Sequence, residues 1–408
     1  MRLSAVLVAA TILPLSLAQA PTYSDSIFSP AIAQKYARVG ANYRKGEFPH
    51  VTDTAGKWQW TKADWWTSGF LPSSFYLLHE RSKLCPTHKD LTSVDWLALA
   101  RRWSDSVAPL QYSNSRGHDQ GFLSYPFMYE LEVNPNNQTA ATAVNNFAGR
   151  LAARYNKVVG CTRSWSGTTG GVTVPNGPDF LVIIDNMMNL EVLERSKQLT
   201  GNKTLESIAI SHSNKTMVNH LRSDASSYHV VDYNVNTGKV IFKGTWQGYT
   251  NSSTWTRGQA WGIHGFATMY SYTKQTQFLT TSRRMADLFI ARTPSSGIIP
   301  WDFDAPSASK LADTSAAAAA AQGMFVLADG LSSVPGDADG AKYYRQKAVK
   351  LMTDTFKFAF KSSQSWDSIL SNGTSNNPSG VKNTGIVYGD YFALKAGNSM
   401  LKLGLASC

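Results

Sequence analysis

Charged side chains are scarce in this 408-residue sequence, and acidic ones are the scarcer kind. Asp, Glu, Lys and Arg make up 16% of the residues, below the ~25% of an average domain. Lys and Arg number 39 against 28 Asp and Glu, a net charge of +11, yet no run of five like charges occurs. The dispersed basic residues argue against a nucleic-acid-binding tail and suit a small acidic ligand.

Cysteine is also rare. Cys85, Cys161 and Cys408 allow three alternative single disulfides, each of which leaves one thiol unpaired, and the sequence does not choose among them. Their spacing suits neither a zinc site nor an iron–sulfur cluster. We therefore expect no metal centre and a fold that is stabilised mainly by its hydrophobic core.

Several common catalytic motifs are missing from the chain. There is no Gly-x-x-x-x-Gly-Lys-Ser/Thr, Gly-x-Gly-x-x-Gly, Gly-x-Ser-x-Gly or His-Glu-x-x-His sequence. These absences argue against nucleotide phosphate binding, nicotinamide chemistry, serine esterase activity and zinc proteolysis, and we expect no cofactor. Carboxylates, His and Arg remain, beside 12 Trp and 17 Tyr, a combination suited to acid–base chemistry on carbohydrate.

Long apolar runs are absent beyond the N-terminal region. Residues 1–20 have the pattern of a secretory signal peptide, with Arg2, an apolar run from Leu3 to Leu17, and small residues before a cleavage site after Ala20. We therefore expect a secreted, extracellular protein without membrane attachment, whose residues 21–408 form one domain. Five Asn-x-Ser/Thr sequences predict N-glycosylation at Asn137, Asn202, Asn214, Asn251 and Asn372.

Helical periodicity dominates the mature chain. Apolar residues recur at i, i+3, i+4 and i+7 in twelve segments, at residues 27–43, 64–80, 93–107, 121–132, 138–157, 184–198, 203–220, 253–273, 277–291, 314–329, 341–360 and 388–405. A β-hairpin is predicted for residues 229–242, with its turn at Asn236–Gly238. Twelve helices can alternate inward and outward around an axis, which predicts an all-α (α/α)6 barrel with a hairpin insertion. A helical solenoid is the competing layout, but no fixed repeat is present.

Asp185 lies in an apolar stretch, Phe180–Leu190, just before a predicted helix. Burial there would raise its pKa, as a general acid near neutral pH requires. Alternatively, Asp185 is the N-cap of that helix, and bonds from backbone N–H groups would lower its pKa. Asp119 follows Arg116 and His118 in a loop and is expected to stay ionised, unless it serves only as a turn residue.

Residues 246–262 place polar donors among three tryptophans. Arg257 and Trp261 are four residues apart, hence on one helix face, so Arg257 could grip a carboxylate while Trp261 supports a sugar ring. The alternative is an Arg packed over a core Trp. Gly258 and Gly262 favour the close approach of some other group to the backbone.

Three further aspartate motifs carry weaker signals. Asp64 is a candidate cap for a helix that contains Trp65 and Trp66, although core packing is the commoner fate of such tryptophans. The Asp302-x-Asp304 pair is too sparse for a calcium loop, because no further acid follows at loop spacing. Asp313 before six alanines predicts a capped helix.

These motifs together resemble the unsaturated glucuronyl hydrolases, glycoside hydrolase family 88. The resemblance runs through nearly all of the mature chain, in the order Trp65–Phe70, His118–Phe122, Ile184–Leu190, Arg257–Gly262, Trp301–Pro306 and Tyr388–Phe392. It implies an (α/α)6 barrel and an unusual reaction on the unsaturated uronate that polysaccharide lyases leave at a non-reducing end. The C4=C5 double bond is hydrated, and the resulting hemiketal collapses and releases the next sugar.

The resemblance also implies residue roles. Asp185 would be the acid that protonates C4 and the base that activates water, while Asp119 would support substrate hydroxyls and the developing charge. The substrate would be bound by two ring-flanking tryptophans and several polar side chains: Trp66, Trp261, His118, His229, Gln247 and Arg257.

One segment departs from the family pattern. Members that act on glycosaminoglycan fragments carry a serine-rich stretch before the segment that corresponds to Tyr388–Phe392, whereas this chain reads Pro378-Ser-Gly-Val-Lys-Asn-Thr-Gly-Ile386. We expect Lys382, Asn383 and Thr384 to contribute donors to the uronate carboxylate, with Lys382 adding charge attraction.

Two alternatives stay open. An unsaturated rhamnogalacturonyl hydrolase would use a similar barrel and chemistry on pectin fragments, although the tryptophan-rich motifs favour the glucuronyl group. A non-catalytic secreted sugar-binding barrel would have no need for both Asp119 and Asp185. The expected partner is an unsaturated uronate-containing oligosaccharide, bound by a monomer, with no nucleic acid or membrane involved.

Overall fold

The computed structural model describes residues 22–113, 117–165, 179–306 and 311–408, so the predicted signal peptide and Arg116 lie outside the described residues. Six helices form a closed inner ring in which each contacts the next and the last contacts the first. They are α2 (Phe70–Leu84), α5 (Gln120–Val133), α7 (Glu191–Thr200), α9 (Thr256–Thr273), α11 (Thr314–Ser332) and α13 (Val387–Lys402).

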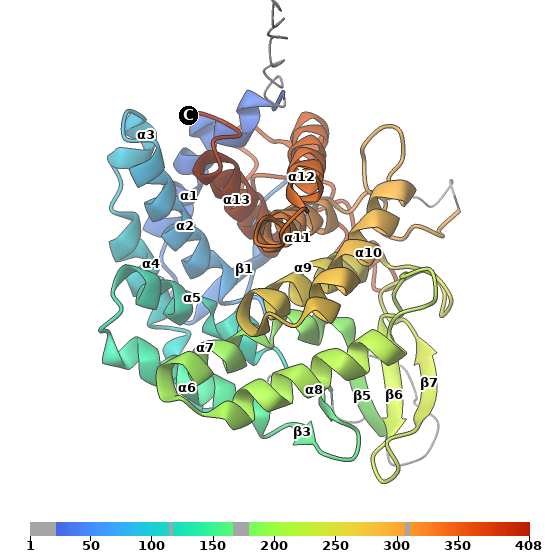
Figure 1. Ribbon diagram of the computed structural model, residues 1–408. Coiled ribbons are helices and arrows are strands. Elements are labelled where there is room, and N and C mark those ends of the chain that lie inside the picture. Colours follow the sequence, from blue (N-terminus) through green and yellow to red (C-terminus); the bar gives the residue numbers. More distant parts are fainter. Residues whose placement is uncertain (1–21, 114–116, 166–178, 307–310) are drawn as a thin grey trace, which may run out of the picture.

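Six outer helices alternate with the inner ones along the chain. They are α1 (Pro30–Ala41), α4 (Trp96–Ser104), α6 (Gln138–Ala152), α8 (Lys203–Asn219), α10 (Thr276–Arg292) and α12 (Ala338–Ala359). In Figure 1, α4, α6 and α8 lie toward the edge of the molecule, while α9 and α11 lie nearer its centre. This alternation is the (α/α)6 barrel, so the predicted fold and its twelve long helices are confirmed. Shorter helices are α3 (Lys89–Thr92) and the 3-10 turns η1 (Asp25–Phe28), η2 (Ala108–Tyr112) and η3 (Ile184–Met188).

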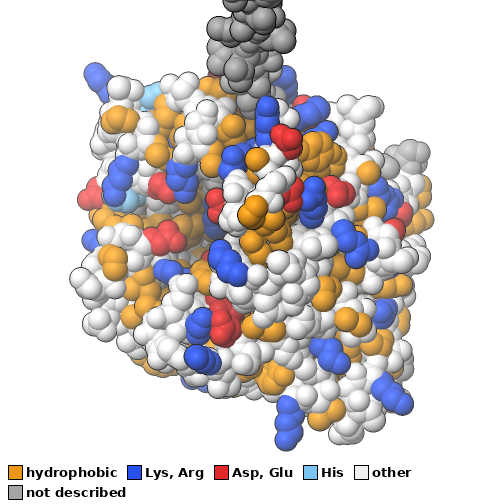
Figure 2. Space-filling model, viewed as in Figure 1, with side chains coloured by type: hydrophobic (Ala, Val, Ile, Leu, Met, Phe, Trp, Pro, Cys, Tyr) orange, Lys and Arg blue, Asp and Glu red, His pale blue; other side chains and the backbone are white. Residues whose placement is uncertain are grey.

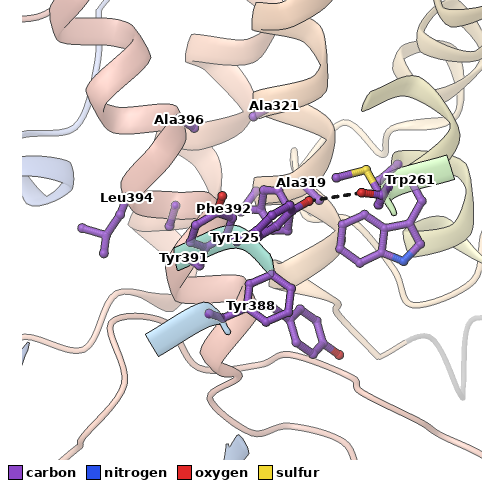
Figure 3. Packing of buried hydrophobic residues seen from close by; sticks show 14 of the residues in the cluster. Tyr125, Trp261, Ala319, Ala321, Tyr388, Tyr391, Phe392, Leu394 and Ala396 are labelled. Atoms are coloured by element: carbon purple, nitrogen blue, oxygen red, sulfur yellow. Dashed lines mark hydrogen bonds between the residues drawn. The ribbon is translucent and has the colours of Figure 1, made fainter. Parts of the chain in front are cut away.

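Most of the inner helices are buried on nearly all sides, as a helix inside two layers must be, whereas α7 buries four of its ten residues. In α11 the six alanines Ala316–Ala321 are all buried, and their small side chains let α9, α12 and α13 pack closely against it. Figure 3 shows bulky rings, among them Phe392 and Tyr125, beside Ala319, while Ala321 lies nearer Ala396. Asp313 accepts hydrogen bonds from Ser315 N and Ala316 N, which confirms the predicted cap of α11.

The glycines of α9 are sites of close approach, as predicted. A Cβ on Gly262 would lie 2.2 Å from Met285 Cε of α10, and one on Gly258 would lie 2.7 Å from the Trp255 ring. The approaching groups are therefore neighbouring core side chains. Such contacts leave no room for even one methyl group without a shift in packing.

Short antiparallel sheets extend from the barrel. β1 (Glu47–Thr52) pairs with β2 (Trp58–Lys62), β3 (Tyr155–Asn156) with β4 (Cys161–Thr162), and β6 (Val230–Asn234) lies between β5 (Asp179–Ile183) and β7 (Val240–Gly244). The β6–β7 pair confirms the predicted hairpin. β5 was not predicted, because a short apolar run before a helix does not distinguish a buried strand from a helical segment.

Two predicted helix starts were wrong. α2 begins at Phe70 with Gly69 at its N-cap position, so Asp64 does not cap it, and Trp65 and Trp66 lie in the preceding turns. α7 begins at Glu191, and Asp185 lies in η3 rather than at the N-cap of an α-helix. Both differences leave side chains on loops at the ends of inner helices, where they are available to a site.

A disulfide joins Cys85 at the end of α2 to Cys408, and Cys161 is a buried free cysteine. The bridge holds the C-terminus beside α2, and the segment that follows α13 lies near the N-terminal helices (Figure 1). Figure 2 shows Lys and Arg side chains spread over one face among Asp and Glu, with no single basic patch on that face. No helix within the described ranges has both the length and the apolar character needed to cross a bilayer.

Glu194 on α7 is a buried carboxyl group whose two oxygens have no hydrogen-bond partner among the described residues. Burial raises its pKa to about 7, and nearby Glu206 adds to the shift. Because the folded-state pKa exceeds the unfolded value of 4.5, this group favours folding below pH 4.5 and loses that contribution as the pH rises through 7. We expect Glu194→Gln to stabilise the protein by about 2 kcal/mol at pH 8 and by little at pH 4. Denaturant unfolding at pH 4 and pH 8 measures the free energy of unfolding of both proteins. An equal effect of the substitution at the two pH values would contradict a raised pKa of Glu194.

Candidate active site

A cleft of about 940 Å³ opens where several inner helices begin. It is lined by residue 50 and by segments 65–66, 165, 245–251 and 375–381. Segment 65–66 leads toward α2, segment 245–251 toward α9, and segment 375–381 toward α13. The barrel thus gathers segments that are far apart in sequence at one end of the inner ring, where helix N-termini favour negative charge.

The walls of the cleft are aromatic. Trp165 and Trp246 are stacked, with ring centroids 4.5 Å apart and planes inclined by 17°. Trp66 lies half-buried beside Tyr388, with ring centroids 5.0 Å apart. At the rim Trp65 is 39% exposed and Tyr249 46% exposed, so their faces are accessible to a ligand. Trp165 was not predicted from the sequence, since a lone Trp before a Gly- and Thr-rich segment gives no periodic signal.

Asp185 is brought to this end of the barrel by η3, at the end of β5. It is 8% exposed, and its Oδ2 lies 3.5 Å from Nε2 of His229, the residue that precedes β6. Burial opposes ionisation of Asp185, but its interactions with His229, His118 and Arg257 outweigh that effect and hold its pKa below the ordinary value. Of the two alternatives for Asp185, the lowered pKa has the right direction, but its cause is not an N-cap. The sequence does not show the cationic and hydrogen-bonding neighbours that the fold supplies.

His229 has a defined orientation. Its Nδ1 lies 3.3 Å from the backbone nitrogen of Trp246 and 3.4 Å from Thr245 Oγ1. Because a backbone N–H can only donate, Nδ1 is the unprotonated nitrogen of the neutral ring, and the proton lies on Nε2. Nε2 then directs its N–H toward Asp185 Oδ2.

Asp119 lies at the N-cap position of α5 but makes no capping hydrogen bond with its side chain. Its Oδ1 lies 3.3 Å from Nε2 of buried His118. Burial lowers the pKa of His118 to about 4, so the ring is neutral near pH 7. The Trp165 ring lies 6.3 Å from the His118 ring and 6.2 Å from the His229 ring, which places the two His–Asp pairs on the same side of the cleft.

Arg257, predicted to grip a carboxylate, is buried and already engaged. Nη1 lies 2.5 Å from Asp313 Oδ2 and donates to the carbonyl of Thr374 at 2.6 Å. Nη2 donates to Gln247 Oε1 at 2.8 Å and to the carbonyl of Ser375. Its guanidinium therefore joins two walls of the cleft, through Gln247 on one and Ser375 on the other. Of these two partners, Gln247 is the one predicted from the sequence to bind substrate.

Other predicted binding residues differ in position. Trp261 has no exposed surface and packs against Phe392 in the core, so its ring does not flank the cleft in this structure (Figure 3). Lys382 and Asn383 are exposed and Thr384 is buried, and none of the three is among the described residues that line the cleft. The neighbouring Ser375 and Asn376 line it instead. The sequence signal for these two was only their place in a polar loop before Tyr388–Phe392.

The predicted glycosylation sites vary in accessibility. Asn202 and Asn251 are exposed, whereas Asn137, Asn214 and Asn372 are partly buried. The Asn137 Nδ2 donates to Glu130 Oε1 at 3.0 Å, and Asn251 lines the cleft. A glycan at Asn251 would crowd the entrance, so among these sequences Asn202 offers the least hindered acceptor.

Two properties of the cleft describe its ligand. No Lys or Arg is among the described residues that line it, so a carboxylate bound there would meet neutral donors rather than a charge. Trp246 Nε1, on the wall of the cleft, is a buried donor that makes no hydrogen bond within the described part of the chain. Asp185 Oδ2 and His229 Nε2 face each other at 3.5 Å, and neither residue is among those that line the cleft. Because nearly all buried polar groups in native proteins have partners, the Trp246 N–H on the cleft wall is available as a donor to a polar group of a ligand. No set of three or more His, Cys, Asp or Glu side chains in the described ranges could hold a metal ion.

Comparisons with known proteins agree on one family. No protein-family model matches the chain. It is 33% identical over 338 residues to an unsaturated glucuronyl hydrolase of Formosa agariphila, covering 81% of this chain and 78% of that protein. It is 32% identical to the enzyme of the same name from Bacillus sp. strain GL1, covering 75% and 78%.

The solved structures show the same fold. A crystal structure of a heparin-specific unsaturated glucuronyl hydrolase superposes with a TM-score of 0.81 at 29% identity, covering 94% of this chain and 98% of that one. The Bacillus sp. GL1 enzyme, described as responsible for glycosaminoglycan degradation, gives 0.82 at 27% identity, covering 94% and 97%. With more than four-fifths of its length aligned at 33% identity, the chain belongs to the unsaturated glucuronyl hydrolase family.

Proposed function

We propose that this protein is a glycoside hydrolase that releases the Δ4,5-unsaturated uronic acid from the non-reducing end of lyase-generated oligosaccharides. The observation that carries the proposal is the buried Asp185–His229 pair beside a tryptophan-walled cleft. Family membership supports the reaction type. The names of the relatives support the substrate class, and one neighbouring structure holds an unsaturated tetrasaccharide, dGlcA-Glc-Rha-Glc.

The chemistry requires one group that gives and then takes a proton. A proton is added to C4 of the substrate and the oxygen of water bonds to C5, so the alkene becomes a hemiketal. The proton that water loses restores the group that supplied the first one. Asp185 fits both steps, because its low pKa in the free protein makes it a base, while a bound substrate carboxylate would raise that pKa by like-charge repulsion and favour the acid form.

The remaining roles follow from position. Asp119, held by His118, would bind substrate hydroxyls near the reacting carbons, and His229 would orient Asp185. Trp66 and the Trp165–Trp246 stack would contact the faces of the sugar rings, and Gln247 with Ser375 would supply neutral donors. We further propose that the protein is secreted and glycosylated, which the leader-like residues 1–20 and the Asn-x-Ser/Thr sequences support. A monomer is the oligomeric state that we propose with it.

A panel of lyase-generated unsaturated disaccharides tests the proposal. We expect loss of alkene ultraviolet absorbance with glucuronan- or glycosaminoglycan-derived substrates, and a kcat/KM at least tenfold lower with the rhamnogalacturonan-derived one. Reversal of that order would identify an unsaturated rhamnogalacturonyl hydrolase. Measurable affinity without any absorbance loss would instead identify a non-catalytic sugar-binding barrel.

A further inference from the structure

One wall of the cleft rests on a buried carboxylate that has no place in the reaction proposed above. This wall is the cleft loop (residues 245–253), which joins β7 to α9 and supplies seven of the residues that line the cleft. Asp302 lies beneath it and has no exposed surface. The segment that carries Asp302 is fixed to the barrel, since Thr256 N donates to the carbonyl of Trp301 at 3.2 Å.

Both oxygens of Asp302 accept hydrogen bonds. Oδ2 accepts from Tyr249 N at 2.8 Å and from Ser253 Oγ at 2.7 Å, while Oδ1 accepts from the backbone nitrogen of Asp304 at 2.9 Å. A Cβ on Gly248 would lie 2.9 Å from Oδ2, so the loop bends tightly over the carboxylate at this glycine. Asp302 thus ties the middle and the end of the cleft loop to one rigid point.

The start of the same loop sets the orientation of His229. Trp246 N donates to His229 Nδ1 at 3.3 Å, and Gly248 N donates to Thr245 Oγ1 at 2.8 Å. The bonds therefore form a continuous path from Asp302 through the cleft loop to His229, whose Nε2 faces Asp185. A loop released at Tyr249 would free the Trp246 N–H that keeps Nδ1 unprotonated.

We propose that Asp302 is a positioning residue that acts through the cleft loop to keep the His229 proton on Nε2, facing Asp185. The inference rests on the proposed function for its effect on turnover, but its structural part can be observed without substrate. A carboxylate is needed at this position because both of its oxygens accept hydrogen bonds, Oδ2 from the cleft loop and Oδ1 from Asp304 N. An asparagine has one acceptor oxygen, so its NH2 group would face either Asp304 N or the pair Tyr249 N and Ser253 Oγ.

The test compares Asp302→Asn with the unsubstituted protein in two measurements. We expect kcat/KM on the preferred unsaturated disaccharide to fall at least tenfold, with kcat reduced as well as KM raised. We also expect 15N NMR of the histidine rings to show one Nε2-protonated form of His229 in the unsubstituted protein and a mixture of tautomers in the variant. The His229 signals are identified by their loss in His229→Gln.

Asp304→Asn is the matched control, because Asp304 lies in the same segment but bonds Thr254 N and Arg292 outside the cleft loop. If Asp302→Asn folds poorly, Ser253→Ala removes one of the Oδ2 bonds and should shift both measurements in the same direction by a smaller amount. Unchanged His229 signals in Asp302→Asn, or an equal loss of kcat/KM in Asp304→Asn, would overturn the inference. An unsubstituted protein that is inactive on every disaccharide would refute the proposed function and leave the NMR comparison decisive for Asp302.

Discussion

Replacing Asp185 with Asn is expected to lower kcat for the unsaturated disaccharide by about 10³-fold or more while the barrel stays folded. The amide keeps the shape of the side chain and can still face His229 Nε2, which lies 3.5 Å from Oδ2. It cannot carry the proton to C4 or remove one from water. The decline in absorbance of the conjugated alkene measures the rate, and circular dichroism with thermal unfolding confirms the fold.

A second buried aspartate offers a matched control for Asp185→Asn. Asp232 is fully buried on β6 and accepts from Phe180 N at 3.0 Å, a bond that an asparagine oxygen can also accept. Asp232→Asn should therefore retain most of the activity. If Asp185→Asn kept more than a tenth of the normal kcat, Asp185 would not be the acid–base group.

The helices were predictable because they bury apolar faces at a regular spacing. Even α11, with Ala316–Ala321 inside it, keeps a run of strong helix formers after Asp313. The missed strands are short and lie at the ends of the barrel, where β5 continues directly into η3. A local pattern cannot reveal that Asp179–Ile183 pairs with residues 230–234, because that pairing joins segments about fifty residues apart. The Cys85–Cys408 disulfide joins residues still farther apart in the sequence, so it could not be predicted from a local pattern either.

The candidate site was predictable in its aspartates and less so in its surroundings. Asp119 and Asp185 stand in motifs that carry the family resemblance, and the barrel brings both to the end that bears the cleft. The environment of each depends on tertiary neighbours. Burial of Asp185 was foreseeable from its apolar flanks, whereas its low pKa comes from His229, His118 and Arg257, which the fold brings near. Likewise, nothing in the sequence near Arg257 shows that its guanidinium will form an ion pair with Asp313.

Arg257 is expected to matter more for stability than its predicted role in carboxylate binding would require. Arg257→Met should lower the free energy of unfolding by about 3–5 kcal/mol, because it leaves the Asp313 charge buried without its cation. The carbonyls of Thr374 and Ser375 would also lose their donors. Denaturant unfolding in the absence of substrate measures the change in the free energy of unfolding. If Arg257 served only to bind a ligand, that change would be small.

The double variant Arg257→Met with Asp313→Asn separates the charge from the packing. Removing the stranded carboxylate should recover part of the lost stability, and the recovered amount measures the cost of the unpaired charge. The exposed pair Arg283–Asp337, with side chains 42% and 24% exposed, provides the comparison, since Arg283→Met should cost less than about 1 kcal/mol. If Arg257→Met lowered the free energy of unfolding no more than Arg283→Met does, the buried Arg257–Asp313 ion pair would be unimportant for stability. Arg257 would then again be a candidate for binding the substrate carboxylate.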